Sequence, residues 1–145
     1  MPSAASDYVV STDPSRLDLD WIHDRLSTDA YWAAGRSRER MERAAADSHC
    51  YGVYAPEGGQ VGFARLVTDR TTFAWLSDVY VDRSVRGMGL SKALMARIMD
   101  DVKEWKLRRV VLATDDAAEL YRKFGFVELG DEPFTFMSAR WPDNV

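Results

Sequence analysis

The sequence predicts an α+β domain built around one mixed, mostly antiparallel sheet, and three features of its pattern lead to this fold class. Alternating apolar runs in the middle of the chain are joined by short polar turns, which is typical of an antiparallel meander. A strongly amphipathic helix and then a further apolar run follow, which predicts a parallel crossover. The expected order of elements is β-α-α-β-β-β-α-β-α-β-β, with helices flanking the sheet.

The N-terminal third predicts one short strand and two helices. Residues 8–11 form the strand. The first helix has two alternative starts, at Asp13-Pro14 and at Asp18, because proline suits the first helical turn and aspartate caps it. The second helix covers residues 37–47, and its arginines lie on one side of it.

The middle of the chain changes to the period of strands. Residues 50–55 and 60–68 are rich in Val, Tyr and Phe, and the Pro-Glu-Gly-Gly turn between them predicts a hairpin. Residues 72–81 add a third strand to this antiparallel meander.

The second half begins with an amphipathic helix that starts near Leu90, where apolar residues keep strict i, i+4 spacing. Residues 108–114 contain a continuous apolar run, which predicts a strand buried on both faces. A short helix over 116–124 should end at Gly125 in a left-handed cap. Two closing strands are predicted, at residues 126–129 and 134–140.

Length and composition indicate one domain over residues 1–145, because this is the size of a single core. The net charge of −4 argues against broad binding of nucleic acid or anionic lipid. A single cysteine excludes an internal disulfide, and no Cys and His residues have zinc spacing, so no metal is expected. Neither a membrane span nor a secretion signal is evident, so we expect a cytoplasmic protein. A homodimer is left open.

A loop with two glycines joins the third meander strand to the amphipathic helix, in the run Arg86-Gly87-Met88-Gly89-Leu90-Ser91. The N–H groups at the start of a helix and the helix dipole favour an anion there, phosphate above all. The spacing matches neither G-x-x-x-x-G-K-[ST] nor G-x-G-x-x-G, which disfavours a nucleotide triphosphatase and a dinucleotide site. The alternative is that the glycines only form a tight turn.

This run resembles the R/Q-x-x-G-x-G/A signature with which the GNAT superfamily of N-acetyltransferases binds acetyl-CoA. The stretch from Ala117 to Phe126, A-A-E-L-Y-R-K-F-G-F, is similar to a second signature of that family. Ser91 stands where the family prefers Gly or Ala, and Thr114 lies near where many members carry an asparagine that contacts the cofactor. The resemblance covers essentially the whole chain, so it implies a GNAT-like fold.

The resemblance implies that acetyl-CoA is the acyl donor. The strand before the loop would diverge from its neighbour and pair with the pantetheine arm, while the loop would hold the pyrophosphate. The residues implied to contact acetyl-CoA are Val79, Tyr80, Val81, Arg86, Gly87, Met88, Gly89, Leu90, Ser91, Thr114 and Tyr121.

Two residues are candidates for the proton transfers. Tyr121 matches the family's tyrosine, which implies a general acid for the leaving thiolate; the alternative is a core aromatic. Asp78 lies on the strand beside the thioester, facing away from Val79, and desolvation there should raise its pKa toward the range of a general base. The alternative for Asp78 is a structural role in fixing the neighbouring loop.

The acceptor is implied to enter between the first two helices and the opposite strands. The candidate acceptor residues are Trp21, Tyr31, Trp32, Arg36 and Phe134. Aromatic side chains would suit an organic amine, although the tryptophans could instead only pack the helices onto the sheet. The arginines of the second helix indicate a solvated face and leave an acidic acceptor open.

Together these residues predict an acetyl-CoA-dependent N-acetyltransferase. It would move the acetyl group to a primary amine of a small molecule or peptide by direct attack in a ternary complex. The alternative is a non-catalytic acetyl-CoA or CoA-binding sensor or regulatory domain, which keeps the cofactor loop but lacks a competent base.

Overall fold

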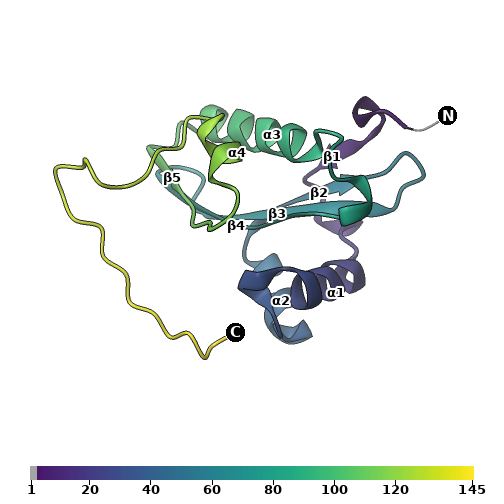
Figure 1. The fold of residues 1–145 in the computed structure, drawn as a ribbon, viewed down its shortest axis with the longest axis horizontal. Coiled ribbons are helices and arrows are strands. Elements are labelled where there is room, and N and C mark those ends of the chain that lie inside the picture. The colour runs from purple at the N-terminus through teal and green to yellow at the C-terminus, as the bar shows by residue number, and fades with distance from the viewer. Residues whose placement is uncertain (1–2) are drawn as a thin grey trace.

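A computed structural model, which describes residues 3–145, confirms the α+β fold class. A five-stranded sheet carries helices on both of its faces (Figure 1). The strands are β1 (Val9–Ser11), β2 (His49–Tyr54), β3 (Gln60–Thr68), β4 (Phe73–Val81) and β5 (Arg109–Val111). The helices are α1 (Leu19–Asp29), α2 (Arg38–Ala46), α3 (Leu90–Trp105) and α4 (Ala118–Arg122). None of the helices in this described part has the length and apolar content needed to cross a membrane.

The strands follow chain order, β1-β2-β3-β4-β5, and only the β4–β5 pair is parallel. The core is split by the sheet into two layers. On one face α3 buries Leu94 and Ile98 completely against the sheet. On the other face α1 and α2 bury Ile22 and Met41. The helices therefore flank the sheet as predicted, with α3 on one face and α1 and α2 on the other, as Figure 1 shows.

Side-chain caps determine where the first two helices begin. The Asp18 carboxylate accepts a hydrogen bond from the Trp21 N–H at 3.0 Å, so Asp18 starts α1. The competing start at Asp13-Pro14 forms only a separate 3-10 turn. Ser37 caps α2 in the same way, through the N–H of Arg40.

Strand β4 has two irregularities that shape the middle of the sheet. Its register with β3 shifts between Phe63 and Arg65, and opposite this bulge Asp78 adopts a positive φ of 56°. Its parallel pairing with β5 extends only from Phe73 to Trp75. Within residues 3–145, no strand pairs with the remaining half of β4 on that side. The carboxyl end of β4 is thus an open edge on that side, in the part of the chain that the structure describes.

The two predicted closing strands are wrong: residues 126–129 and 134–140 have no strand pairing in the described part of the chain. The strand predicted over 108–114 shortens to β5, which is half-buried rather than buried on both faces. The two differences have one cause. Because the closing strands do not form, no strand among the described residues pairs with the outer edge of β5. Phe134 and Phe136 instead pack on the guanidinium of Arg109, with centroids 5.5 and 4.9 Å from its central carbon.

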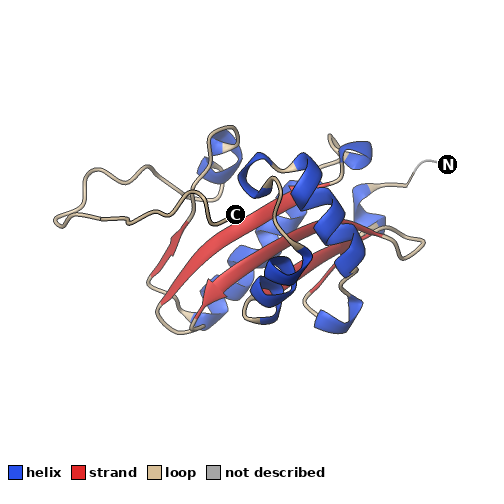
Figure 2. Cartoon of the chain, turned by 90° about the horizontal axis from the view of Figure 1, so that it is seen from below, coloured by secondary structure: helices blue, strands red, loops and turns tan. Residues whose placement is uncertain are grey.

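After α4 the chain runs in a wide arc around the β5 edge of the sheet and ends beside α2 on the opposite face (Figures 1 and 2). The turn into this segment contains Gly125 at φ +91°, in the left-handed region that was predicted for it. We call residues 126–145 the C-terminal arm. The arm thus connects the α3–α4 side of the molecule with the α1–α2 side.

Candidate functional site

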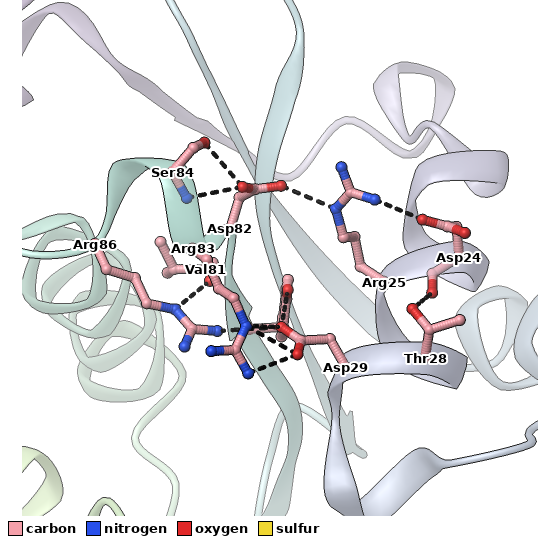
Figure 3. Close-up of polar contacts among 10 residues, drawn as sticks. Asp24, Arg25, Thr28, Asp29, Val81, Asp82, Arg83, Ser84 and Arg86 are labelled. Atoms are coloured by element: carbon pink, nitrogen blue, oxygen red, sulfur yellow. Dashed lines mark hydrogen bonds and ion pairs between the residues drawn. The ribbon is translucent and has the colours of Figure 1, made fainter.

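The loop that follows β4 is fastened to α1 by a network of charges, drawn in Figure 3. The Arg83 guanidinium binds both oxygens of the Asp29 carboxylate, with Nη2 donating to Oδ1 at 2.6 Å and Nε donating to Oδ2 at 2.8 Å and to Oδ1 at 2.9 Å. The Tyr80 hydroxyl donates to the same carboxylate at 2.6 Å. The hydrogen bonds from Arg83 and Tyr80 lower the pKa of Asp29 to about 2. Arg25 adds a second tie by donating to Asp82 at 2.9 Å.

The start of α3 presents backbone donors to open space. Gly87 and Gly89 have φ values of +86° and +84°, which residues other than glycine rarely adopt. A Cβ at either position would meet no atom within 4 Å, so the backbone is open to close approach. No side chain caps the helix, and the first bond from its interior runs from Ala93 N–H to the Gly89 carbonyl. The N–H groups of the first turn therefore remain available for an anion.

The other residues of the loop motif divide between charge and packing. Arg86 donates from Nε to the Val81 carbonyl at 2.9 Å and keeps about half of its side chain exposed beside the loop. The Leu90 side chain is buried in the core below α3, and the Met88 side chain is half-buried against that core. The side chain of Ser91 is half-buried in the first turn.

Residues 76–81 of β4 offer a backbone edge next to this loop that pairs with no strand on that side among residues 3–145. Its side chains alternate between the two core layers: Val79 and Val81 pack toward α3, and Tyr80 packs toward α1. Thr114, which lies beyond β5, accepts a hydrogen bond from the Ala117 N–H at 3.0 Å. The Thr114 hydroxyl thus helps to start α4, and the cofactor contact implied for this position stays a prediction.

Tyr121 extends from α4 and is buried, with 8% of its surface exposed. Its ring meets Phe126 edge to face at 5.9 Å. Within the described residues its hydroxyl has no hydrogen-bond partner. Burial, with the nearby charges of Asp116 and Tyr31, raises the pKa of Tyr121 to about 12. The phenol therefore holds its proton at any physiological pH.

Asp78 is the centre of a buried polar cluster on the opposite face of β4 from Val79. Trp32 Nε1 donates to its Oδ1 at 2.8 Å, and Oδ2 accepts from Arg36 Nη1 at 2.7 Å and from Arg65 Nε at 2.6 Å. Desolvation works to raise the pKa of Asp78, but the hydrogen bond from Arg36 and the charge of Arg65 outweigh it, so the pKa lies below its ordinary value. The predicted rise in this pKa is wrong.

The structure brings together three of the five predicted acceptor residues. Tyr31 and Trp32 meet edge to face at 4.9 Å, and Trp32 and Arg36 both bind Asp78. The Tyr31 hydroxyl accepts a hydrogen bond from the Asp115 N–H at 3.2 Å, which connects this group to the segment before α4.

The other two predicted acceptor residues lie elsewhere. Trp21 packs edge to face on Tyr80 at 6.0 Å, inside the layer between α1 and the sheet. Phe134 lies on the C-terminal arm beside Arg109, near the outer edge of β5. Neither side chain lines the cavity that Trp32 and Arg36 share.

Sequence reasoning missed Arg65 and the pair of Asp29 and Arg83. Arg65 had a usable signal, because it is one charged residue within the apolar run of β3 and therefore needs a partner if its strand is buried. Asp29 and Arg83 are 54 residues apart in the chain, and nothing in the local pattern of either one indicates the other.

Comparisons with known proteins agree on one family. Residues 17–126 match the family model described as acetyltransferase (GNAT) family. A Xanthomonas campestris protein assigned to that family, known from a crystal structure, is 42% identical to this chain in sequence. The alignment covers 98% of this chain and 96% of the Xanthomonas chain, and the two structures superpose with a TM-score of 0.86. An assigned acetyltransferase of Gibberella zeae is 34% identical over 81% of this chain and 77% of its own length.

A more distant structure, Rv2747 from Mycobacterium tuberculosis, was solved in complex with CoA. It is 23% identical and covers 88% of this chain and 76% of its own, with a TM-score of 0.71. At this identity the likeness concerns the fold. The family match and the two nearer relatives cover most of the chain, including both signature runs. This chain therefore belongs to the GNAT acetyltransferase family, a family of N-acetyltransferases.

Proposed function

We propose that the protein transfers the acetyl group of acetyl-CoA to a primary amine of a small molecule or peptide, by direct attack in a ternary complex. One observation carries this proposal. The free backbone edge of β4 includes Asp78 and Val79, and the acceptor group is bound to the side chain of that same Asp78, on the face opposite to Val79. A donor on the edge and an amine beside Asp78 would thus be neighbours.

The donor side fits acetyl-CoA, which supplies the acetyl group as a thioester. The backbone groups of Val79 to Val81 can pair with an amide-bearing arm as a further strand would. A backbone N–H on this edge is suited to polarise the thioester carbonyl. The N–H groups from Gly87 to Ser91, with Arg86 beside them, would hold the pyrophosphate.

The proton transfers follow from the protonation states in the site. Tyr121 keeps its proton at neutral pH and can give it to the thiolate that leaves. The lowered pKa of Asp78 makes it a poor base, and its three hydrogen bonds suit a positioning residue that holds Trp32 and Arg36 in place. We propose that the proton of the amine passes to water in the acceptor cavity.

The test is release of CoA, followed with a thiol reagent, from acetyl-CoA and a panel of primary amines. We expect release only when an amine is present, together with an acetylated product of matching mass. Tight acetyl-CoA binding without CoA release from any amine would overturn the proposal and favour the non-catalytic CoA-binding domain. Binding of acetyl-CoA itself is measured separately by calorimetry.

Turnover should rise with pH from about 7 to about 9.5. The acceptor amine has an ordinary pKa of ~10.4, so the fraction without a proton increases over this range. Tyr121, whose pKa is about 12, remains protonated and active throughout, so no alkaline decline is expected below about pH 10. Steady-state rates over this range, with circular dichroism to verify folding at each pH, provide the measurement. A bell-shaped profile with a fall near pH 8 would remove Tyr121 from the acid role.

Asp29→Asn should weaken acetyl-CoA binding severalfold while changing kcat little. The substitution removes the charge that holds Arg83 and Tyr80, so the loop before α3 keeps only its tie from Asp82 to Arg25 of α1. Hydrogen exchange of residues 82–89 should quicken, and calorimetry should show the higher Kd. Asp20→Asn is the matched control, since Asp20 lies on the same helix and, in the described part of the chain, forms an ion pair only with Arg38 at the surface. Equal affinity in both variants would contradict the role of the tie.

A further inference from the structure

A cavity of about 540 Å³ opens beside the Asp78 cluster, and its wall is unusually rich in arginine. It lies between α2, β3 and the end of the C-terminal arm. Five arginines and two tryptophans line it: Arg36, Arg40, Arg43, Arg65, Arg140, Trp32 and Trp141. The chain as a whole has a net charge of −4. The cavity therefore has the opposite sign to the rest of the protein.

The positive charge of this wall is only partly compensated by the protein. Arg36 and Arg65 are both bound to the buried Asp78 carboxylate. Arg43 has Glu39 at 4.0 Å, an exposed pair at the limit of an ion pair. Among residues 3–145, neither Arg40 nor Arg140 has a carboxylate within 4 Å. Two to three guanidinium groups are therefore left to bind something else.

From this arrangement we infer that the acceptor carries an anionic group, a carboxylate or a phosphate, in addition to its amine. This inference rests on the proposed function and names the class of its acceptor. Arg40, Arg43 and Arg140 bind the anion, since a guanidinium presents a planar pair of donors that matches both groups. Trp32 and Trp141 give the cavity apolar walls for the body of the molecule.

The charges along the cavity indicate which end binds the amine of the acceptor and which end binds its anionic group. Asp78 compensates one of the two positive charges of Arg36 and Arg65, whereas Arg40 and Arg140 have no carboxylate within 4 Å among the described residues. The Asp78 end, beside β4, is therefore the less positive end and the one where we place the amine, and the anion binds at the more positive α2 and C-terminal arm end. A cavity of one sign also concentrates ligands of the opposite sign and speeds their association.

The activity test compares amines that differ only in the anionic group. L-phenylalanine is compared with 2-phenylethylamine, and O-phosphoethanolamine with ethanolamine, so the two pairs distinguish a carboxylate from a phosphate. We expect the anionic member of at least one pair to have a kcat/KM about tenfold higher or more, as a charge-assisted hydrogen bond allows. The double variant R40Q/R43Q should reduce this preference to about twofold. Arg38→Gln, on the same helix but outside the cavity, should keep it.

A second readout does not depend on catalysis. Calorimetry with 3-phenylpropanoate, which has the carboxylate but no amine, should detect binding to the wild-type protein and to Arg38→Gln. R40Q/R43Q should bind it at least about tenfold more weakly. Circular dichroism verifies that each variant is folded.

The outcomes separate this inference from the proposed function. If neutral amines are acetylated as well as anionic ones and the double variant changes neither rate nor probe binding, the acidic acceptor is wrong while the acetyltransferase stands. If the probe binds through Arg40 and Arg43 but no amine releases CoA, the anion site stands and the proposed function fails. Probe binding that R40Q/R43Q leaves unchanged overturns the inference by itself.

Discussion

Gly89→Val is expected to reduce acetyl-CoA affinity about 100-fold or more. Gly89 begins α3 at φ +84°, a conformation in which a β-branched residue is strained by about 1–3 kcal/mol. Relief of that strain would rotate the N–H groups of the first helical turn away from their common direction. The valine side chain would also occupy the open space next to the backbone, where the pyrophosphate is proposed to lie. Calorimetric titration with acetyl-CoA measures the loss.

Two further variants separate the causes of that loss. Gly59→Val places the same side chain in the β2–β3 turn, at a glycine with open surroundings and no positive φ, and should bind acetyl-CoA normally. Gly89→Asn tests close approach alone, because asparagine tolerates the left-handed conformation. It should fold as the wild type does and still bind at least about tenfold more weakly. Wild-type affinity in Gly89→Val would show that the diphosphate lies elsewhere.

Tyr121→Phe should lower kcat by about 100-fold or more and leave the Kd for acetyl-CoA within about twofold, which is the range expected for loss of a general acid. The phenol loses only its hydroxyl, which makes no hydrogen bond in the described structure, so the packing against Phe126 is retained. Stopped-flow single turnovers and equilibrium titration with acetyl-CoA give the two constants independently.

Tyr54→Phe is the matched control for this substitution. Tyr54 is buried on β2, and its hydroxyl lacks a partner among the described residues, so the same atom is removed away from the site. Its kcat should equal that of the wild type. An unchanged kcat in Tyr121→Phe would leave Tyr121 as a core aromatic only, and an equal fall in both variants would point to a general loss of stability.

The elements that could be predicted are those whose signals are local. The i, i+4 spacing from Leu90 located α3, and Asp18 was one of the two predicted starts of α1 because its capping partner lies three residues away. The loop with Gly87 and Gly89 was identified for the same reason, since positive φ and an uncapped helix start depend on residues next to each other.

The parts that were missed depend on contacts between distant residues. The pKa of Asp78 was predicted to rise from burial alone, and only the fold brings Arg36, from the loop before α2, and Arg65, from β3, onto its carboxylate. The alternation at 134–140 is a genuine strand pattern, but a strand also needs a partner edge, and the arm departs from β5 instead. The residues at 134–140 therefore favour the strand conformation locally, but the fold gives them no neighbouring strand to pair with.

The course of the C-terminal arm has a practical consequence for recombinant work. The arm ends beside α2, and its last residue, Val145, lines the arginine-rich cavity. A purification tag fused after Val145 would therefore begin at the mouth of that cavity, and an acidic linker or epitope there would compete with ligands for Arg40 and Arg43. The first described residues pack on the α3 side of the sheet, away from this cavity (Figure 1), so a tag is better placed before them.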